Sequence, residues 1–328
     1  MKVVVLGSGS MGSAVANYTA GISHDTILWG RNKEFISALS ITRENEKYLP
    51  GIKYSDKLNF SSDLDVCLDA DIIIFAVPSY AVIKLLAEIK SILGDSVTEK
   101  HFIITSKGLD PVSSSFISDS LDKLLPEKNY LFMQGPSFSQ ELAEKLPTAF
   151  TLASYREDVI TYVKTNLESE KVFFDISKEV CGIQLLGSLK NLFAIILGIA
   201  EGLNYEANTK SAIFVHCYQE LCSFLDELGI DSKTVLTYAG IGDLYLTTTD
   251  NKSRNKRFGK YLGEGLTIAD SLSKVGQVVE GYANHQIIDK FIQSNKLNSK
   301  AIAVLINILK EQISPKEGMS LILFSSKR

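Results

Sequence analysis

The stretch that decides the fold of the N-terminal half is Lys2-Val-Val-Val-Leu6, followed at once by Gly7-Ser-Gly-Ser-Met-Gly12. The first piece is an apolar, β-branched run typical of a buried strand, and Ser13–Ala20 beyond the glycines is compatible with a helix. In this order Gly7 permits a tight turn, Gly9 lets backbone approach a pyrophosphate, and Gly12 lets helix and strand pack closely. The spacing predicts a strand, a dinucleotide-binding turn and a helix.

Further apolar runs extend this pattern along the chain. Four of them have the length of buried strands: Thr26–Trp29, Asp71–Val77, His101–Thr105 and Tyr130–Met133. The segments between these runs have apolar residues at helical spacing. Alternating buried strands and helices predict a parallel, doubly wound sheet, whose ligands lie beyond the carboxyl ends of the strands. After about Phe174 the apolar positions instead repeat at helical intervals, over 181–203, 211–228 and 297–313. We therefore predict an α/β chain: a Rossmann-like, doubly wound domain at 1–178, followed by a mainly α-helical substrate and catalytic domain at 179–328.

Lys190 is the most unusual residue of the second half, because it interrupts the apolar run Gly182–Ala200. This run is long enough to cross a bilayer, but a lysine at the centre of a membrane helix costs roughly 2.5 to 3.5 kcal/mol. A buried helix within a globular domain fits better. There the amine must be paired or used, since desolvating it alone is expensive, so Lys190 is a candidate for the site.

Composition excludes several classes of function. The formal net charge of −4 provides no general attraction for nucleic acid, and the N-terminus lacks the cleavage region of a signal peptide, which predicts a cytoplasmic protein. The cysteines show no CxxC pair and the histidines no ligand spacing, so neither disulfides nor a metal site are expected. These residues are Cys67, Cys181, Cys217, Cys222, His24, His101, His216 and His285.

The second predicted strand ends in Trp29-Gly-Arg-Asn32, where NAD-selective proteins usually carry an acidic residue for the ribose. Arg31 could pair with a 2′-phosphate, which favours NADP(H). Glu34 is close by, and Arg31 as a solvated surface residue is the alternative, so NAD stays open. Ser10 and Met11 are expected beside the cofactor.

Polar clusters follow other predicted elements. Lys107–Asp110 and Gly135–Ser139 come directly after strands, on the expected ligand edge. In the helical half, Gly240–Thr249 is followed by Asn251-Lys-Ser-Arg-Asn255, in which Arg254 offers a planar fork for two phosphate oxygens. The alternative is a solvated basic turn, and this is the expectation for Lys252, Lys256 and Arg257.

Taken together, these motifs resemble the NAD(P)-dependent glycerol-3-phosphate dehydrogenases of the soluble bacterial type, in order and spacing over almost the whole chain. The pieces are Gly7–Gly12, Ser106–Leu109, Gly135–Phe138, Leu189–Asn191, Gly240–Leu244, Asn251–Asn255 and Gly276–Gly281. The resemblance implies hydride transfer from NAD(P)H to dihydroxyacetone phosphate, a small phosphorylated substrate, with a role in phospholipid synthesis.

The resemblance also implies roles for individual residues. Lys190 would donate or accept the proton, with Asp243 orienting it and Lys107 tuning it by its like charge. Substrate would be held by Lys107, Gly135, Ser137, Lys190, Asp243, Ser253, Arg254 and Asn255. Cofactor would be held by Gly7, Gly9, Ser10, Met11, Gly12, Arg31, Lys107, Ser139, Arg254, Val278 and Glu280. Ser137, Ser139 and Lys210 depart from the common residues of the family, which affects affinity rather than the reaction.

Two other functions stay open at this point. A related two-domain NADP-dependent reductase for keto or hydroxy acids would share the glycine loop and a lysine in its helical domain, but it would not require the phosphate-binding loop at 251–255. A non-catalytic dinucleotide sensor would not require Lys190 and Asp243 beside that loop. The sequence leaves the oligomeric state open, with a homodimer as one alternative.

Overall fold

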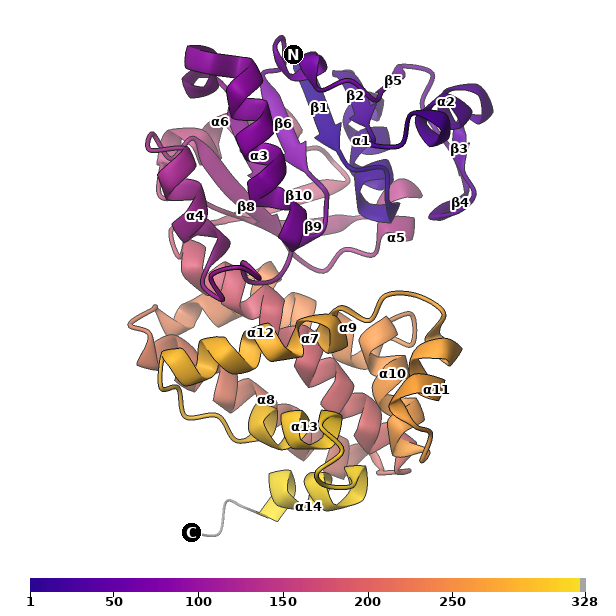
Figure 1. The fold of residues 1–328 in the computed structure, drawn as a ribbon, viewed down its shortest axis with the longest axis vertical. Helices are drawn as coiled ribbons and strands as arrows, with labels where there is room; N and C mark the ends of the chain where they lie inside the picture. Colours follow the sequence, from indigo (N-terminus) through magenta and orange to yellow (C-terminus); the bar gives the residue numbers. More distant parts are fainter. Residues whose placement is uncertain (325–328) are drawn as a thin grey trace. The chain divides into compact units, whose positions relative to one another are not determined.

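The computed structural model describes residues 1–324, and the chain divides into two compact units. The first contains Met1–Asp110 and Phe116–Val180, and the second contains Pro111–Ser115 and the chain from Cys181 onward. The first unit is built around a sheet with helices on it, whereas the second is helical (Figure 1). The predicted fold class, α/β followed by a mainly α-helical part, is confirmed.

The first unit contains an eight-stranded sheet with the strand order β10-β9-β8-β7-β6-β1-β2-β5. Its strands are β1 (Lys2–Leu6), β2 (Asp25–Trp29), β5 (Leu58–Ser61), β6 (Ile72–Phe75), β7 (His101–Ile104), β8 (Tyr130–Gln134), β9 (Thr148–Ala153) and β10 (Val172–Ser177). A separate hairpin pairs β3 (Glu44–Asn45) with β4 (Leu49–Lys53). All the strands predicted from apolar runs are present.

The order of the strands reverses at β1. This strand lies parallel to β2 on one side and to β6 on the other, with Val4 opposite Ile27 and Ile73. The chain builds outward from β1 through β2 to β5, and then returns to β6 to build in the other direction. Such a switch point leaves a crevice at the carboxyl ends of the strands, so the loop after β1 lies where ligands of doubly wound sheets bind.

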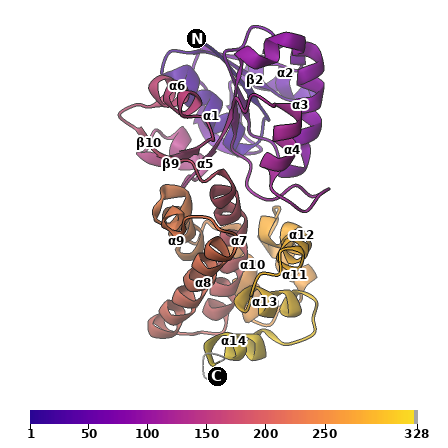
Figure 2. The same ribbon diagram turned by 90° about the vertical axis from the view of Figure 1, so that its left-hand side faces the viewer.

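Helices cover both faces of the sheet (Figure 2). The helices of this unit are α1 (Ser10–Gly21), α2 (Lys33–Thr42), α3 (Ser79–Leu93), α4 (Ile117–Leu124), α5 (Ser139–Ala143) and α6 (Glu157–Leu167), with short 3₁₀ turns η1 (Leu64–Cys67) and η2 (Gly94–Glu99). Alternate side chains of each strand point to opposite faces. Val3 and Val5 therefore share a core with α1 and α6, whereas Val4 and Phe75 are buried on the other face.

One strand pair departs from the all-parallel prediction. β8 and β9 are antiparallel, with Met133 opposite Leu152, while β10 is again parallel to β9. The connection from β8 to β9 contains the short helix α5, which reaches only Ala143. The five residues of α5 rise only about 7.5 Å, roughly half the length of a five-residue strand, so this helix does not carry the chain back to the start of β8, and the chain turns back beside β8 instead.

The second unit is an assembly of helices and short turns. These are α7 (Val180–Gly202), α8 (Ala207–Glu227), η3 (Ser232–Leu236), η4 (Tyr238–Gly242), α9 (Asp243–Thr249), α10 (Arg254–Gly263), α11 (Ile268–Val275), α12 (Glu280–Ser294), α13 (Ala301–Leu309) and α14 (Pro315–Phe324). Helices α8, α13 and α14 lie side by side (Figures 1 and 2). The helical texture predicted after Phe174 is confirmed.

Helix α7 is long and apolar enough, within residues 1–324, to span a membrane by length and composition. However, 94% of its most apolar window is buried inside the protein. The prediction that this segment is a core helix carrying a buried lysine is confirmed.

Helices α7 and α10 approach each other so closely that glycines stand at the points where their backbones meet. A Cβ added at Gly198 would lie 2.1 Å from the carbonyl oxygen of Lys256, and one added at Gly259 would lie 2.1 Å from that of Ile195. Any side chain at Gly198 or Gly259 would overlap the facing backbone, so only glycine allows the two backbones to approach this closely. The contact sets the position of α10, which carries Arg254 and Asn255, against α7, which carries Lys190.

We predict that Gly259→Ala destabilises the protein by about 1 to 3 kcal/mol, because the new methyl group overlaps the backbone of α7. In an open helical position the same change would instead stabilise by about 0.5 to 1 kcal/mol. Gly21→Ala at the end of α1 is the control, since a Cβ there has no atom within 4 Å. Urea denaturation followed by circular dichroism measures both variants, and an unchanged midpoint for Gly259→Ala would contradict the close contact.

Candidate functional site

The glycine loop has the geometry that its sequence predicts. Gly7 has a φ of +120°, which L side chains rarely adopt, and a Cβ there would meet the carbonyl oxygen of Ala76 at 2.5 Å. A Cβ at Gly12 would lie 1.8 Å from the carbonyl oxygen of Gly7, whereas one at Gly9 would meet nothing within 4 Å. Gly9 is thus the open face of the loop, at the N-terminus of α1, where backbone N–H groups favour an anion.

A second segment holds this loop from behind. Asn45 on β3 is fully buried, and its amide donates to the carbonyl oxygen of Ser8 at 3.0 Å and to Ser13 Oγ at 2.9 Å. Its Oδ1 accepts from the backbone N–H of Tyr48 at 3.1 Å. The hydroxyl of Ser10, predicted beside the cofactor, donates to the carbonyl oxygen of Tyr48. The β3–β4 hairpin therefore fixes the loop's shape.

The other predicted residues of the first unit lie after its strands. Lys107 Nζ donates to the carbonyl oxygen of Gly135 at 3.3 Å, and Ser137 Oγ donates to the same oxygen at 3.1 Å. The structure thus brings Lys107, Gly135 and Ser137 together. Ser139 begins α5, and Arg31 is exposed between β2 and α2. Met11 is partly buried against the core, so its side chain supports α1.

Lys190 is the centre of the polar cluster in the second unit. It is 7% exposed, and its Nζ lies 2.6 Å from Asp243 Oδ1 and 2.7 Å from Thr247 Oγ1. Asp243 begins α9 and is 1% exposed, and Thr247 one turn later also donates to the carbonyl oxygen of Asp243. A buried ammonium is tolerable when paired and hydrogen-bonded in this way. The pair can stabilise developing negative charge and transfer a proton.

A second network joins α7, α10 and α12 at the next residue of α7. Asn255 Nδ2 donates to Asn191 Oδ1 at 2.9 Å, and Asn255 Oδ1 accepts from the N–H of Gly281 at 2.9 Å. Asn191 Nδ2 also donates to Glu280 at 3.3 Å, and Arg254 Nη2 lies 3.8 Å from Glu280 Oε1. The structure therefore brings together Arg254, Asn255 and Glu280, all of which were predicted.

Ser253 has a role that the sequence did not indicate, and the expectation for Lys256 was wrong. Ser253 caps α10, because its Oγ accepts from the N–H of Lys256 at 3.3 Å. Val278 is 65% exposed in the turn before α12. Lys256 was expected to be solvated, but it is 8% exposed, because Glu201 on α7 offers a carboxylate at 2.9 Å. Lys252 is exposed, as expected.

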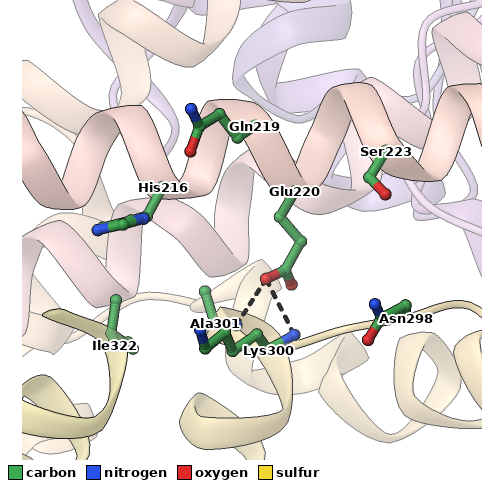
Figure 3. Close-up of a pocket in the computed structure, with 8 residues that line it drawn as sticks. All are labelled: His216, Gln219, Glu220, Ser223, Asn298, Lys300, Ala301 and Ile322. Atoms are coloured by element: carbon green, nitrogen blue, oxygen red, sulfur yellow. Dashed lines mark hydrogen bonds between the residues drawn. The ribbon is translucent and has the colours of Figure 1, made fainter. Parts of the chain in front are cut away.

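The helical unit also contains two concave regions. A cavity of about 320 Å³ is lined by residues of α8, α13 and α14, among them His216 and Glu220 (Figure 3). Its carboxylate is already in use: Glu220 accepts from the N–H groups of Lys300, Ala301 and Ile302 and thereby caps α13. This cavity contains none of the predicted site residues, so we do not assign the reaction to it. A second cavity of about 450 Å³ adjoins Lys256 and Glu201.

In the described part of the chain, no group of three or more His, Cys, Asp or Glu side chains could hold a metal ion. The polar groups at both clusters are instead suited to an organic anion.

A switch-point glycine loop on a doubly wound sheet, together with a buried lysine–aspartate pair in a helical unit, defines a dinucleotide-dependent oxidoreductase. Comparison with known proteins narrows this class. The models of the NAD-dependent glycerol-3-phosphate dehydrogenase N-terminus and C-terminus match residues 2–160 and 179–320. The chain belongs to the NAD-dependent glycerol-3-phosphate dehydrogenase family.

Individual relatives agree with this. The chain is 34% identical over 311 residues to a glycerol-3-phosphate dehydrogenase [NAD(P)+] of Colwellia psychrerythraea, covering 94% of this chain and 92% of the relative. It is 35% identical to one of Legionella pneumophila, covering 90% and 88%. The crystal structure of glycerol-3-phosphate dehydrogenase from Coxiella burnetii superposes with a TM-score of 0.91 at 28% identity, over 98% of both chains.

Sequence reasoning missed Thr247, Asn191 and Asn45 as supporting residues. Thr247 had a readable signal, since it follows Asp243 by four residues on a helix and so shares its face. Asn191 directly follows Lys190, but its partners come from distant parts of the chain. Asn45 had no local signal, because what it supports lies 32 to 37 residues earlier.

We predict that Asn45→Ala weakens binding of NADPH by roughly tenfold, because a lost buried hydrogen bond costs about 1 to 3 kcal/mol and the loop loses its shape. Enhancement of NADPH fluorescence measures the dissociation constant. Asn59→Ala is the control, since the Asn59 amide makes a long, exposed contact of 3.4 Å with Asp25 on the neighbouring strand. A normal dissociation constant for Asn45→Ala would remove the hairpin from cofactor binding.

Proposed function

We propose that this protein catalyses the interconversion of dihydroxyacetone phosphate and sn-glycerol 3-phosphate by hydride transfer with NAD(P)H. Family membership and the glycine loop support the cofactor and the reaction class. The observation that carries the proposal is the buried Lys190, held between Asp243 and Thr247 at 2.6 and 2.7 Å. The match to both family models favours this reaction over a related keto or hydroxy acid reductase or a sensor.

The proposed chemistry at Lys190 follows from its charge. A bound reduced nicotinamide would supply the hydride to the ketone carbon. As negative charge develops on the carbonyl oxygen, the Lys190 ammonium stabilises it and delivers a proton from Nζ. Asp243 orients the ammonium, and Thr247 Oγ1 holds it from a second direction. In the reverse direction Lys190 accepts the proton.

Substrate binding is proposed for groups in both units. Arg254 binds the phosphate through its planar fork, which converts phosphate affinity into orientation of the reacting carbon. Asn255 has a second amide N–H beyond the one engaged by Asn191, and it donates to the same anion. Ser253 fixes the start of α10, and Lys107, Gly135 and Ser137 contact the substrate from the first unit. Ser137 tunes affinity, as do the further departures at Ser139 and Lys210.

For the cofactor we propose binding by the glycine loop and by residues of both units. These are Gly7, Gly9, Ser10, Met11, Gly12, Arg31, Lys107, Ser139, Arg254, Val278 and Glu280. Exposure of Arg31 directly after β2 supports pairing with a 2′-phosphate and thus a preference for NADPH over NADH.

In cellular terms, we propose a cytoplasmic enzyme whose product feeds glycerophospholipid synthesis. Residues 1–178 form the dinucleotide-binding domain and 179–328 the substrate and catalytic domain. A homodimer is the proposed assembly, supported by the exposed apolar side chains on the helical unit: Val215, Leu236, Tyr238 and Tyr245.

The reaction is tested by mixing the purified protein with dihydroxyacetone phosphate and following the loss of nicotinamide absorbance, with NADPH and NADH in parallel. We expect oxidation that depends on the phosphate group, faster with NADPH. Unphosphorylated dihydroxyacetone is the control, and it should react far more slowly because Arg254 has no anion to hold. Protein that binds either cofactor but oxidises neither would contradict the proposal.

We predict that Lys190→Ala lowers kcat by about 100-fold or more, since it removes both the charge stabilisation and the proton. Cofactor affinity should be retained, because the glycine loop is untouched. Steady-state kinetics and NADPH fluorescence separate the two effects. Lys233→Ala, at an exposed position of η3, is the matched control and should behave as the parent protein. Near-normal turnover of Lys190→Ala would exclude Lys190 as the acid.

A further inference from the structure

Lys256 is the second buried lysine of the helical unit, and its partners saturate it. Its Nζ donates to the carbonyl oxygen of Thr249 at 2.7 Å and to Asn251 Oδ1 at 2.8 Å, and it lies 2.9 Å from Glu201 Oε2. An ammonium has three N–H donors, so each finds an acceptor. The side chain is therefore fully committed to contacts within the protein, and it does not bind a ligand.

These partners belong to separate elements. Thr249 ends α9, Asn251 lies in the loop 250–253, Glu201 is on α7, and Lys256 itself is in the first turn of α10. One ammonium thus ties the loop, and both helices beside it, to α7. The backbone of Lys256 is fixed as well, because its carbonyl oxygen lies against Gly198.

Glu201 forms an ion pair with a second lysine, Lys260. Lys260 Nζ lies 3.1 Å from Glu201 Oε1, on the exposed side of α10. Burial alone would raise the pKa of Glu201, but its hydrogen bonds to Lys256 and Lys260 outweigh burial and lower the pKa below the usual value. The carboxylate is therefore ionised at neutral pH and holds both cations.

The anchored loop leads directly into Arg254, so the contacts of Lys256 bear on the position of Arg254. It begins α10 directly after the loop, its side chain is 41% exposed, and its contact with Glu280 is long at 3.8 Å. Because this contact is long, the position of the Arg254 backbone at the end of the loop decides which region the guanidinium can reach. Any freedom in the loop would have to be lost on binding, and that loss weakens affinity.

We propose that Lys256, anchored on Glu201, is a positioning residue that holds the loop 250–253 so that Arg254 faces the substrate phosphate. The inference rests on the proposed function, because it needs Arg254 to bind that phosphate. Lys256 acts through Arg254 and touches neither substrate nor cofactor.

Lys256→Met tests this, since it keeps the unbranched stem and removes the ammonium. Glu201 stays paired with Lys260, so no buried carboxylate is left alone and the fold should survive. At saturating NADPH we expect KM for dihydroxyacetone phosphate to rise about tenfold while kcat changes less than about twofold, since orientation of the phosphate is lost and the acid is not. Lys256→Arg, which can reach the same acceptors, should recover most of the affinity.

Lys260→Met is the matched control. It removes a lysine from the same carboxylate, but within residues 1–324 Lys260 has no contact with the loop. Its KM should stay within about twofold of the parent value. Equal effects of the two variants would overturn the proposal, because the loop would then not matter. Should Lys256→Met fail to fold, Asn251→Ala removes one loop contact at an exposed position and should raise KM in the same way; an unchanged KM there would overturn the proposal too.

A double-mutant cycle isolates the route through Arg254. In an Arg254→Ala background, Lys256→Met should leave KM unchanged, because the group it positions is gone. A rise of about tenfold in that background as well would show that Lys256 acts elsewhere, and would overturn the inference. Hydrogen exchange at the amides of 249–256 gives a readout without activity: exchange should quicken in Lys256→Met and not in Lys260→Met. A parent protein without phosphate-dependent activity, yet with this exchange pattern, would refute the proposed function and leave the loop anchor intact.

Discussion

The ion pair between Lys190 and Asp243 is the constraint on which the helical unit depends. Removing two charges from water costs several kcal/mol per ion, and mutual attraction offsets this only when the geometry is good. Here the N–O distance is 2.6 Å, and Thr247 supplies a further acceptor at 2.7 Å. The two partners come from α7 and α9, separated by 53 residues, so every contact that places α9 beside α7 also maintains the pair. A purely structural role would be better served by apolar residues, which supports a chemical use of the lysine.

In both units, glycines allow close backbone contacts that position polar groups. In the first, Gly12 lets α1 start against the carbonyl of Gly7, so the N-terminus of the helix meets the end of β1. In the second, Gly198 and Gly259 let α7 and α10 touch through their backbones. Contacts of this kind cannot be adjusted by a change of rotamer, so they transmit position rigidly. Ser10 and Arg254 lie two and five residues before Gly12 and Gly259, so these contacts fix the backbone from which each side chain extends.

The parts of the fold that were predictable are those with a local signal. The run Lys2–Leu6, the glycines after it and the apolar texture of α7 each carry their structure within a few residues, and the structure has them in place. The antiparallel β9 was missed because the direction of a strand depends on whether the connection before it contains a helix long enough to cross the sheet, which apolar runs do not reveal. Asn45 and Lys256 were missed or misjudged for a related reason. A polar residue in a polar stretch looks solvated until its distant partner, Ser8 or Glu201, is known.

Two hydrogen-bond networks surround α10, one centred on Asn255 and the other on Lys256. Asn255, Asn191 and the N–H of Gly281 satisfy one another in the interior, and Lys256 satisfies the loop with Glu201 behind it. These paired groups mainly fix the shape of the site, and the second amide N–H of Asn255 is the one group of this network that we propose donates to the anion. Arg254 is the opposite case, with a side chain 41% exposed and a long contact to Glu280, so its charge is available to a ligand. In this arrangement the accessible guanidinium supplies most of the affinity, and its buried neighbours supply the geometry. Phosphate binding is strong only when the loop is already ordered, because little of the binding energy is then lost to ordering it.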